Sequence, residues 1–460
     1  MQADPALLAR DVDHYLQVAE PPEAPPRCPK ALIAPHAGHV YSGRTAGRAY
    51  ALVRPFGQLG SGRIRRVVLM GPAHRVYVKG IALPGVDAYA TPLGQVPVAT
   101  LGALALADLP FVATRPDVHG PEHSLEVHVP FLQRALGRFE LLPLVVGDAT
   151  PAQVSQVIER LWGGDDVLWV ISTDLSHFHS YDQANAIDAA SCAQVLALDG
   201  RLDHEQACGA TPVNGLLAVA RQKGLRIEQI ERCNSGDTGA NTPQGRERVV
   251  GYASFALYQD AEVVGTAGGE ALAQQGVDAR QGARLVGLAR AALNAAVGMP
   301  AGQCDAAADL QAPGATFVTL TQAGRLRGCI GSLQAHRPLA EDVRDNAVAA
   351  ALHDPRFAPV SASEAPALRV EVSVLTPARP LPFANQAHAL WQLQPGRDGV
   401  VFECSHQGRL FRSTFLPQVW EQLPNLVAFM AHLKAKAGLP QDFWSPEVRL
   451  SVYRVQKFLE

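Results

Sequence analysis

The sequence has no excess of positive charge and no long apolar run. Its 40 basic and 43 acidic residues give a formal charge of −3, so no basic field is available to attract nucleic acid or anionic lipid. No stretch approaches the 18 uninterrupted apolar residues of a membrane span, and residues 1–20 carry several charges where a signal peptide needs an apolar segment. We therefore expect a cytoplasmic protein that binds neither nucleic acid nor membrane.

Cysteine is also scarce, and its distribution argues against a disulfide framework. The seven cysteines are odd in number, scattered along the chain, and form no Cys-x-x-Cys pair. Each is by default a small buried apolar residue, so a cysteine with a chemical role must be argued from its own surroundings.

Apolar residues are plentiful, and their distribution indicates two domains. The chain has 460 residues, of which 47% are hydrophobic, so more than one core is expected. Residues 260–275 are rich in glycine, alanine and glutamine and offer little to bury, which indicates a linker between domains at 1–259 and 276–460. An earlier run of prolines within 21–26 predicts a short extended segment.

The first domain is predicted to be α/β, with a mainly parallel sheet flanked by helices. Its apolar runs predict buried strands, and helical patterns lie between some of them. The predicted strands are 31–34, 67–70, 141–146, 167–171 and 249–257, and the predicted helices are 6–18, 151–162, 182–198 and 212–222. Pro143 interrupts one of these strands, which makes it the weakest of the set.

The second domain is predicted to be a smaller α+β unit. A helix over 276–297 precedes strands that pair as hairpins rather than alternating with helices. The predicted strands are 316–320, 327–331, 368–375, 399–403 and 409–414.

Histidine or aspartate follows three of the first domain's strands, at the point where each strand ends. His36 and His74 follow the first two, and Asp174 and His177 follow the strand at 167–171. The carboxyl ends of parallel strands meet at one edge of a sheet, so these side chains are expected to share one crevice. A lone histidine at a strand end is more often structural, but three such ends in one domain favour a metal or catalytic site.

Two further stretches offer reactive groups. Residues 122–130 contain His123 and His128, whose spacing does not place both on one helical face, so only one need point inward. Cys208 precedes a predicted helix with Thr211 as its N-cap. A thiol near a helix N-terminus has its thiolate favoured, as a metal ligand requires, although a buried cysteine in a tight turn is an equal alternative.

In the second domain the sequence Arg-Leu-Arg-Gly-Cys-Ile-Gly at 325–331 places Arg327 close to Cys329. The combination is compatible with anion binding or with a reactive thiol in a cleft. The simpler interpretation is that the glycines permit close backbone approach and that the cysteine fills a small hole.

Five spaced motifs in the first domain resemble the Memo family. They are Ala-Pro-His-Ala-Gly at 34–38, Gly-Pro-Ala-His at 71–74, Glu-His-Ser-Leu-Glu-Val-His-Val-Pro at 122–130, Ser-Thr-Asp-Leu-Ser-His at 172–177 and Cys-Gly-Ala-Thr-Pro at 208–212. Memo proteins resemble class III extradiol dioxygenases in fold and carry iron or copper on two histidines and a cysteine. The resemblance implies His36, His74 and Cys208 as ligands. Extradiol dioxygenases use a carboxylate where this chain has Cys208.

The second domain resembles the AMMECR family, through 325–331, His-Asp-Pro-Arg-Phe at 353–357, Glu-Val-Ser-Val-Leu at 371–375 and Phe-Leu-Pro-Gln-Val-Trp at 415–420. The pair is similar to proteins B and A of the AmmeMemoRadiSam systems, which implies a radical-SAM protein as a partner. Fusion raises the effective concentration of each domain for the other.

The resulting hypothesis is an oxidoreductase or dioxygenase-like protein that binds one metal ion and acts on a small molecule or peptide. Fe(II) is the first expectation, with copper or zinc as alternatives. His177 is the expected acid/base, Asp174 orients neighbouring groups, and His123 is a further catalytic candidate. Two alternatives remain, a binding module without turnover and a zinc-assisted hydrolase in which Glu122 or Asp174 activates water.

Overall fold

A computed structural model describes residues 2–17, 27–239, 244–259, 277–302 and 310–460. The expected proline segment and interdomain linker lie outside the described residues. The chain divides into two compact units. Unit 1 comprises Met1–Val263 and Ala384–Gln392, and unit 2 comprises Val264–Phe383 and Leu393–Glu460. The boundaries predicted from composition stay a prediction.

Unit 1 is built on a sheet that contains nine strands within the described residues. The order across it is β10 (Arg226–Asn234), β11 (Val249–Tyr258), β1 (Ala31–Ala34), β8 (Val167–Ser172), β2 (Arg66–Pro72), β7 (Glu140–Val146), β3 (Ile81–Leu83) and β6 (Val112–Thr114), with β9 (His177–His179) paired to β11. The central strands β1, β8, β2 and β7 are parallel, and antiparallel pairs lie on either side of them. The predicted mainly parallel α/β class is confirmed.

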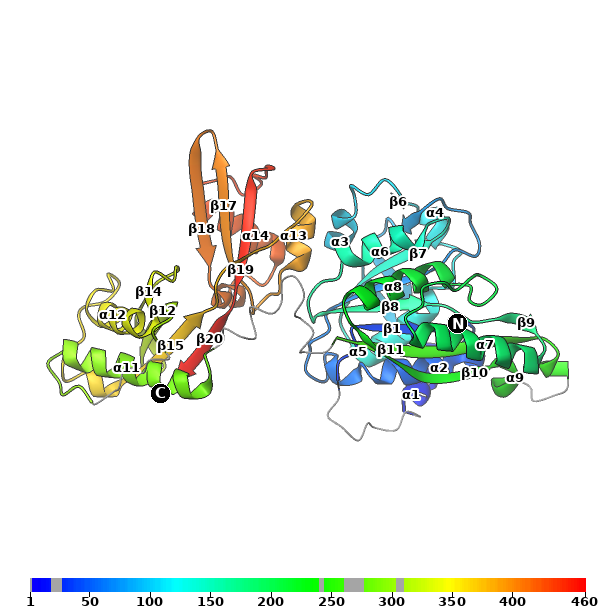
Figure 1. Cartoon of the computed structure of the whole chain (residues 1–460), viewed down its shortest axis with the longest axis horizontal. Helices are drawn as coiled ribbons and strands as arrows, with labels where there is room; N and C mark the ends of the chain where they lie inside the picture. Colours follow the sequence, from blue (N-terminus) through cyan, green and yellow to red (C-terminus); the bar gives the residue numbers. More distant parts are fainter. Residues whose placement is uncertain (1, 18–26, 240–243, 260–276, 303–309) are drawn as a thin grey trace. The chain divides into compact units, whose positions relative to one another are not determined.

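Helices cover both faces of this sheet (Figure 1). The helices α1 (Pro5–Gln17), α2 (His39–Ala51) and α5 (Val129–Leu136) pack on one face, and α6 (Pro151–Arg160), α7 (Tyr181–Leu196) and α8 (Ala210–Gln222) pack on the other. Alternate residues of β1 enter the two cores, since Ile33 belongs to one and Leu32 to the other. Burial on both faces explains why these strands are continuous apolar runs.

The strand β7 accommodates Pro143 because, at this residue, β7 pairs with β2 on one side and not with β3 on the other. Pro143 stands opposite Leu69 of β2, whereas β3 pairs with β7 only at Val145 and Val146. The missing N–H of Pro143 therefore costs no pairing with β3, and the strand predicted there is present.

The short helix α13 (Gln386–Gln392) belongs to unit 1 although it lies far along the chain. Its Trp391 side chain is fully buried in the core beside α6, and its Nε1 donates to the carbonyl of Leu161 at 3.0 Å. The Arg66 guanidinium lies 4.3 Å from the centre of the indole ring and donates to the Trp391 carbonyl. A Cβ at Gly102 would lie 2.9 Å from the indole, so this position requires glycine.

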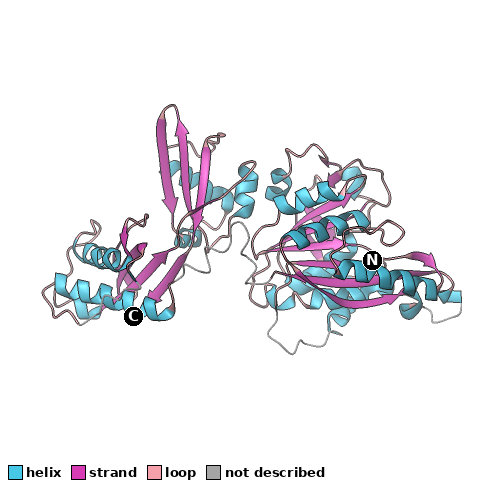
Figure 2. Cartoon of the chain, viewed as in Figure 1, coloured by secondary structure: helices cyan, strands magenta, loops and turns pink. Residues whose placement is uncertain are grey.

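Unit 2 is α+β, as predicted (Figure 2). One sheet has the order β13 (Arg325–Gly331), β12 (Pro313–Gln322), β15 (Leu368–Leu375) and β20 (Val455–Leu459), with β14 (Arg337–Pro338) paired to β12. The helices α11 (Ala279–Ala296) and α12 (Leu339–Leu352) pack against this sheet, and their apolar residues form a core with those of β12 and β15. A second sheet has the order β16 (Arg379–Pro380), β19 (Val448–Tyr453), β17 (Gly399–His406) and β18 (Arg409–Phe415), and α14 (Leu426–Lys436) lies between β18 and β19 in the chain.

Among the described residues, neither unit contains a helix that is both long and apolar enough to span a membrane.

Candidate metal centre

Three neighbouring parallel strands of unit 1 deliver the side chains of the site. His36, Asp174 and His74 each stand two residues beyond the last residue of β1, β8 and β2 respectively. Because β8 lies between β1 and β2 in the sheet, the three ends are adjacent. The sheet edge therefore brings together residues that are up to 138 positions apart, as in the hydrogen bond from the His36 amide to Asp174.

His36, His74 and Cys208 each direct one ligand atom into this crevice. These three atoms all lie within 4.8 Å of one another. The Cys208 thiol stands 3.4 Å from His36 Nε2, and the rings of His36 and His74 are 5.1 Å apart at their centroids. Cys208 arrives from the turn before α8, where its amide donates to the carbonyl of Asp174. The structure thus gathers the three residues predicted as ligands.

The tautomer of His36 is fixed by Ser172. The Ser172 hydroxyl donates its single proton to the carbonyl of Ser124 at 2.6 Å, so it must accept from both neighbouring imidazoles, His36 Nδ1 at 2.6 Å and His128 Nε2 at 2.8 Å. His36 therefore carries its proton on Nδ1 and presents a bare lone pair on Nε2. Burial, followed by the nearness of His74 and His123, holds the pKa of His36 well below its ordinary value, so the ring is neutral.

Glu122 fixes the second imidazole in the same way. One carboxylate oxygen lies 3.0 Å from His74 Nδ1 and accepts from the amide of Ser124. An ionised carboxylate only accepts, so His74 carries its proton on Nδ1 and its Nε2 is free to bind a metal. Burial alone would raise the pKa of Glu122, but hydrogen bonds from His123, His74 and backbone amides outweigh it and hold this pKa far below its usual range.

The sequence predicted that the thiolate form of Cys208 is favoured, and this expectation is wrong for the side chain as it is buried here. Burial, reinforced by the nearby Asp174 carboxylate, raises the pKa of Cys208 to about 12. The predicted N-cap is also displaced, because α8 begins at Ala210 after Gly209 and Thr211 lies inside the helix. A metal ion bound here must displace the thiol proton, as metal-coordinated cysteines do.

Asp174 lies beside the crevice, and the roles predicted for Asp174 and His177 stay predictions. Asp174 is buried, and its Oδ2 lies 4.0 Å from His36 Nε2. Burial raises the pKa of Asp174 above its ordinary value. His177 Nδ1 donates to the carbonyl of Leu175 at 2.8 Å, which leaves Nε2 for proton exchange.

His123 lies beside both predicted histidine ligands. Its ring is 4.9 Å from that of His74 and 5.7 Å from that of His36. Its Nδ1 stands 3.3 Å from Glu122, which raises the pKa of His123. His74, Glu122 and His123 form a second close group of potential ligands. Because Glu122 already accepts from His74, we interpret this group as the support of the first site.

Sequence reasoning missed the role of His128. It expected one of His123 and His128 to point inward, whereas His128 lies behind the crevice and supports His36 through Ser172. Tyr50 completes the chain by bonding His128 Nδ1 at 2.8 Å. The motif at 122–130 includes His128, so sequence analysis could have assigned it a role. No sequence pattern around Tyr50 predicts its bond to His128.

The donor set fits a transition metal. Two neutral imidazole nitrogens and one sulfur are the ligand types preferred by iron, copper and zinc, whereas calcium and magnesium prefer oxygen. Both ring orientations are fixed by groups outside the ligand set, the arrangement usual around metal-binding histidines.

Two family models match the chain. The model of the Memo-like protein family matches residues 1–256, which is more than half of the chain. The chain belongs to the Memo family. The AMMECR1 model matches residues 286–458, so a Memo-like region is fused to an AMMECR1 domain. All the residues gathered in the crevice lie within the Memo-like match.

Several archaeal and bacterial Memo proteins are similar to this region. A MEMO1 family protein of Archaeoglobus fulgidus is 31% identical over 239 residues, which cover 49% of this chain and 85% of the relative. One from Aquifex aeolicus is 33% identical over 235 residues, covering 47% and 82%. Among solved structures, an uncharacterized protein of Pyrococcus horikoshii is 31% identical, with a TM-score of 0.36, over 40% of this chain and 93% of that one.

In the AMMECR1 domain, the predicted site residues Arg327 and Cys329 are hydrogen-bonded to other residues of the protein. Arg327 donates through two nitrogens to both oxygens of Glu364, while its Nη1 is buried without an acceptor among the described residues. Cys329 lies 3.2 Å from the hydroxyl of Thr319, and its amide donates to Asp354. A ligand role for Arg327 and Cys329 stays a prediction.

Replacing Glu122 with glutamine is expected to weaken metal binding by roughly 10 to 100-fold, the usual cost of losing a group that orients a ligand. The amide keeps the shape of the side chain but no longer requires the proton to stay on His74 Nδ1. Titration with Fe(II) or Zn(II) under nitrogen measures the effect. Glu126→Gln, an exposed neighbour in the same segment, is the matched control. Equal affinities in the two variants would contradict the role assigned to Glu122.

Proposed function

We propose that unit 1 is a metal-dependent oxidoreductase that uses one ion bound by His36, His74 and Cys208. The observation that carries this proposal is the gathering of two imidazole nitrogens and a thiol within 4.8 Å, with the protons of both rings held on the far nitrogens. Three protein donors leave coordination positions for a substrate, as in catalytic rather than structural sites.

Iron or copper is the metal we propose, with Fe(II) first. Softness alone admits Fe(II), Cu(I) and Zn(II), because imidazole and thiolate suit all three. The resemblance of Memo proteins to extradiol dioxygenases favours a redox metal. Such an ion would supply one-electron chemistry that none of the surrounding side chains provides.

The chain's own residues would handle protons beside the metal. His177 can exchange a proton at Nε2, because Nδ1 is committed to the carbonyl of Leu175. Asp174 accepts from the His36 amide with one oxygen at 2.8 Å, and its other oxygen lies 4.0 Å from His36 Nε2. We assign the acid/base role to His177 and the orienting role to Asp174, with His123 as a further group in reach of substrate.

The hydrolase alternative has weaker support. A zinc hydrolase needs a carboxylate free to activate water. Glu122 is committed to His74 and to the backbone amides of His123 and Ser124. Asp174 would have to serve instead while still accepting from the His36 amide. We therefore keep hydrolysis as the second candidate.

We further propose that the substrate is a small molecule or peptide shared with a radical-SAM protein. Two points support this proposal. The pair of domains resembles proteins B and A of the AmmeMemoRadiSam systems, and their fusion in one chain raises the effective concentration of each domain for the other.

Oxygen uptake tests the oxidoreductase assignment. Protein prepared under nitrogen is loaded with Fe(II) or with Zn(II) and mixed with the small-molecule fraction of producing cells. The iron form is expected to consume oxygen in response to the extract, and His177→Ala to slow it by roughly 10² to 10⁴-fold. His14→Ala, on α1, is the control. Turnover of extract components by the zinc form alone would favour hydrolysis and reject the proposal.

A further inference from the structure

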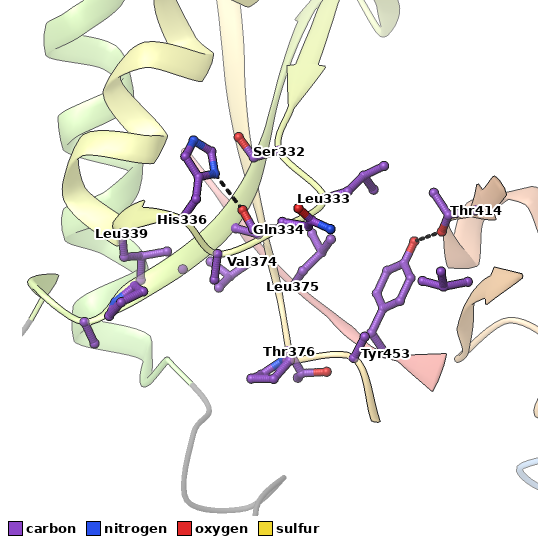
Figure 3. Close-up of a pocket in the computed structure, with 18 of the residues that line it drawn as sticks. Ser332, Leu333, Gln334, His336, Leu339, Val374, Leu375, Thr376, Thr414 and Tyr453 are labelled. Atoms are coloured by element: carbon purple, nitrogen blue, oxygen red, sulfur yellow. Dashed lines mark hydrogen bonds between the residues drawn. The ribbon is translucent and has the colours of Figure 1, made fainter. Parts of the chain in front are cut away.

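Unit 2 contains a cavity that none of the motifs or family matches explains. Its volume is about 1250 Å³, larger than the roughly 300–1,000 Å³ of common small-molecule sites. It lies between the two sheets of unit 2 and is lined by the start of β12, the end of β15, and parts of β17, β18 and β19. The segment 332–336, which directly follows β13, forms another wall (Figure 3).

The floor of the cavity is apolar. Leu339, Val374, Leu375 and Tyr453 contribute to it, and each of them is buried. The Tyr453 hydroxyl does not need a ligand, because it bonds Thr414 at 3.1 Å and the carbonyl of Phe415. Figure 3 shows this pair on the side of the cavity away from His336. The floor is therefore suited to a hydrocarbon or aromatic body.

The rim of the cavity is basic. Of the 24 lining residues none is acidic, whereas three have basic side chains, namely His336, Arg412 and Lys436. Arg412 already has partners within the protein. Its Nε forms an ion pair with Glu403 at 3.1 Å, and its two terminal nitrogens donate to the Gln334 amide oxygen at 2.8 and 3.0 Å when that amide is turned toward the guanidinium. Through Gln334, Arg412 ties the segment 332–336 to β18.

Lys436 is differently placed. Its ammonium group donates to the carbonyl of Thr414 at 3.0 Å and lies 5.1 Å from the ring centre of Phe415. No carboxylate of the described residues lies within ion-pair distance of it. His336 likewise has no acidic partner among these residues, and its Nδ1 bonds the carbonyl of Gln334 at 2.9 Å. The Lys436 ammonium thus borders an apolar cavity without a carboxylate among the described residues to balance its charge.

We propose that this cavity is a binding site for a small organic anion, with an apolar body on the floor and a carboxylate or phosphate group at Lys436. The volume of the cavity and its buried floor favour a small molecule. Charge-assisted hydrogen bonds to the rim fix which end of the ligand faces outward. The site is separate from the metal centre, because every lining residue belongs to unit 2.

Fluorescence titration of the full chain with 8-anilinonaphthalene-1-sulfonate, an aromatic anion, tests the proposal. Lys436→Gln is expected to weaken binding roughly tenfold, the typical effect of losing one charge-assisted contact. Arg409→Gln, which removes a charge from β18 outside the cavity, is the matched control and should leave the affinity unchanged. Ala378→Trp places a large side chain at an exposed lining position and should abolish binding. Circular dichroism checks that each variant is folded.

Displacement of the dye identifies the head group. Decanoate and decyl phosphate share one body and carry the two candidate anions, while decanol carries none. Displacement by either anion at concentrations well below those needed for decanol supports the site, and the better competitor names the head group. Equal displacement by decanol, dye binding that survives Ala378→Trp, or no dye binding to the unmodified protein would each overturn it.

Discussion

Replacing Cys208 with serine is expected to lower the affinity of unit 1 for Fe(II) or Cu(I) by more than roughly 100-fold, beyond the 10 to 100-fold usual for groups that only orient a ligand. Serine preserves size but supplies a hard hydroxyl in place of a soft sulfur. The two histidines that remain, with their Nε2 atoms still presented, cannot by themselves complete the three-donor set.

Cys233→Ser is the matched control for this experiment. Its thiol is also partly buried and bonds the hydroxyl of Thr45 at 3.1 Å, but it takes no part in the crevice. Metal bound per chain, measured after gel filtration under nitrogen, should fall only in the Cys208 variant. Undiminished occupancy in Cys208→Ser would remove this residue from the ligand set.

Replacing Trp391 with alanine is expected to destabilise unit 1 by about 3–5 kcal/mol, the usual cost of deleting a large buried aromatic side chain. The variant leaves a cavity between α6 and α3 (Thr100–Ala105) and deprives the carbonyl of Leu161 of its donor. Trp391→Phe keeps most of the packing and should lose less. A loss of stability in unit 1 would be unusual for this substitution, because Trp391 lies more than 120 positions beyond the end of the Memo-like match.

Hydrogen exchange read by mass spectrometry can assign this loss to unit 1. Amides of the central strand β8 exchange through global opening of their unit, so Trp391→Ala should accelerate them by more than about 100-fold. Amides of β15 in unit 2 serve as the internal reference. Unchanged exchange in β8 would show that α13 contributes nothing to the stability of unit 1.

The crevice that gathers His36, His74 and Cys208 could be predicted because its determinants are local in sequence. Each of the three strands is a continuous apolar run, and the reactive residue follows within two positions of the strand's end. Parallel pairing then forces the three ends together. The position of Cys208 was predicted from its motif, although the charge state of its thiol depends on burial, which a linear pattern does not show.

Other features could not be predicted because they depend on contacts distant in sequence. The strand β10 alternates charged and apolar residues at the sheet edge and lacks the continuous apolar run of the strands that were predicted. The hydrogen bonds from Tyr50 to His128 and from His128 to Ser172 connect α2, the short turn before α5 and β8, which are far apart in the sequence. Helix α13 has only seven residues, too few for a pattern that assigns it to a distant core.

A fragment that ends at residue 262 therefore lacks Trp391 and should show the same loss of stability as Trp391→Ala.

The central claim is that this Memo-family chain binds one redox metal ion at His36, His74 and Cys208. The most direct test is the metal content of the full chain purified without oxygen, measured by mass spectrometry of the acid-digested protein. We predict close to one equivalent of iron or copper per chain, and almost none when Cys208 is serine. Protein that contains no metal, or that holds zinc equally well with and without Cys208, would contradict the account.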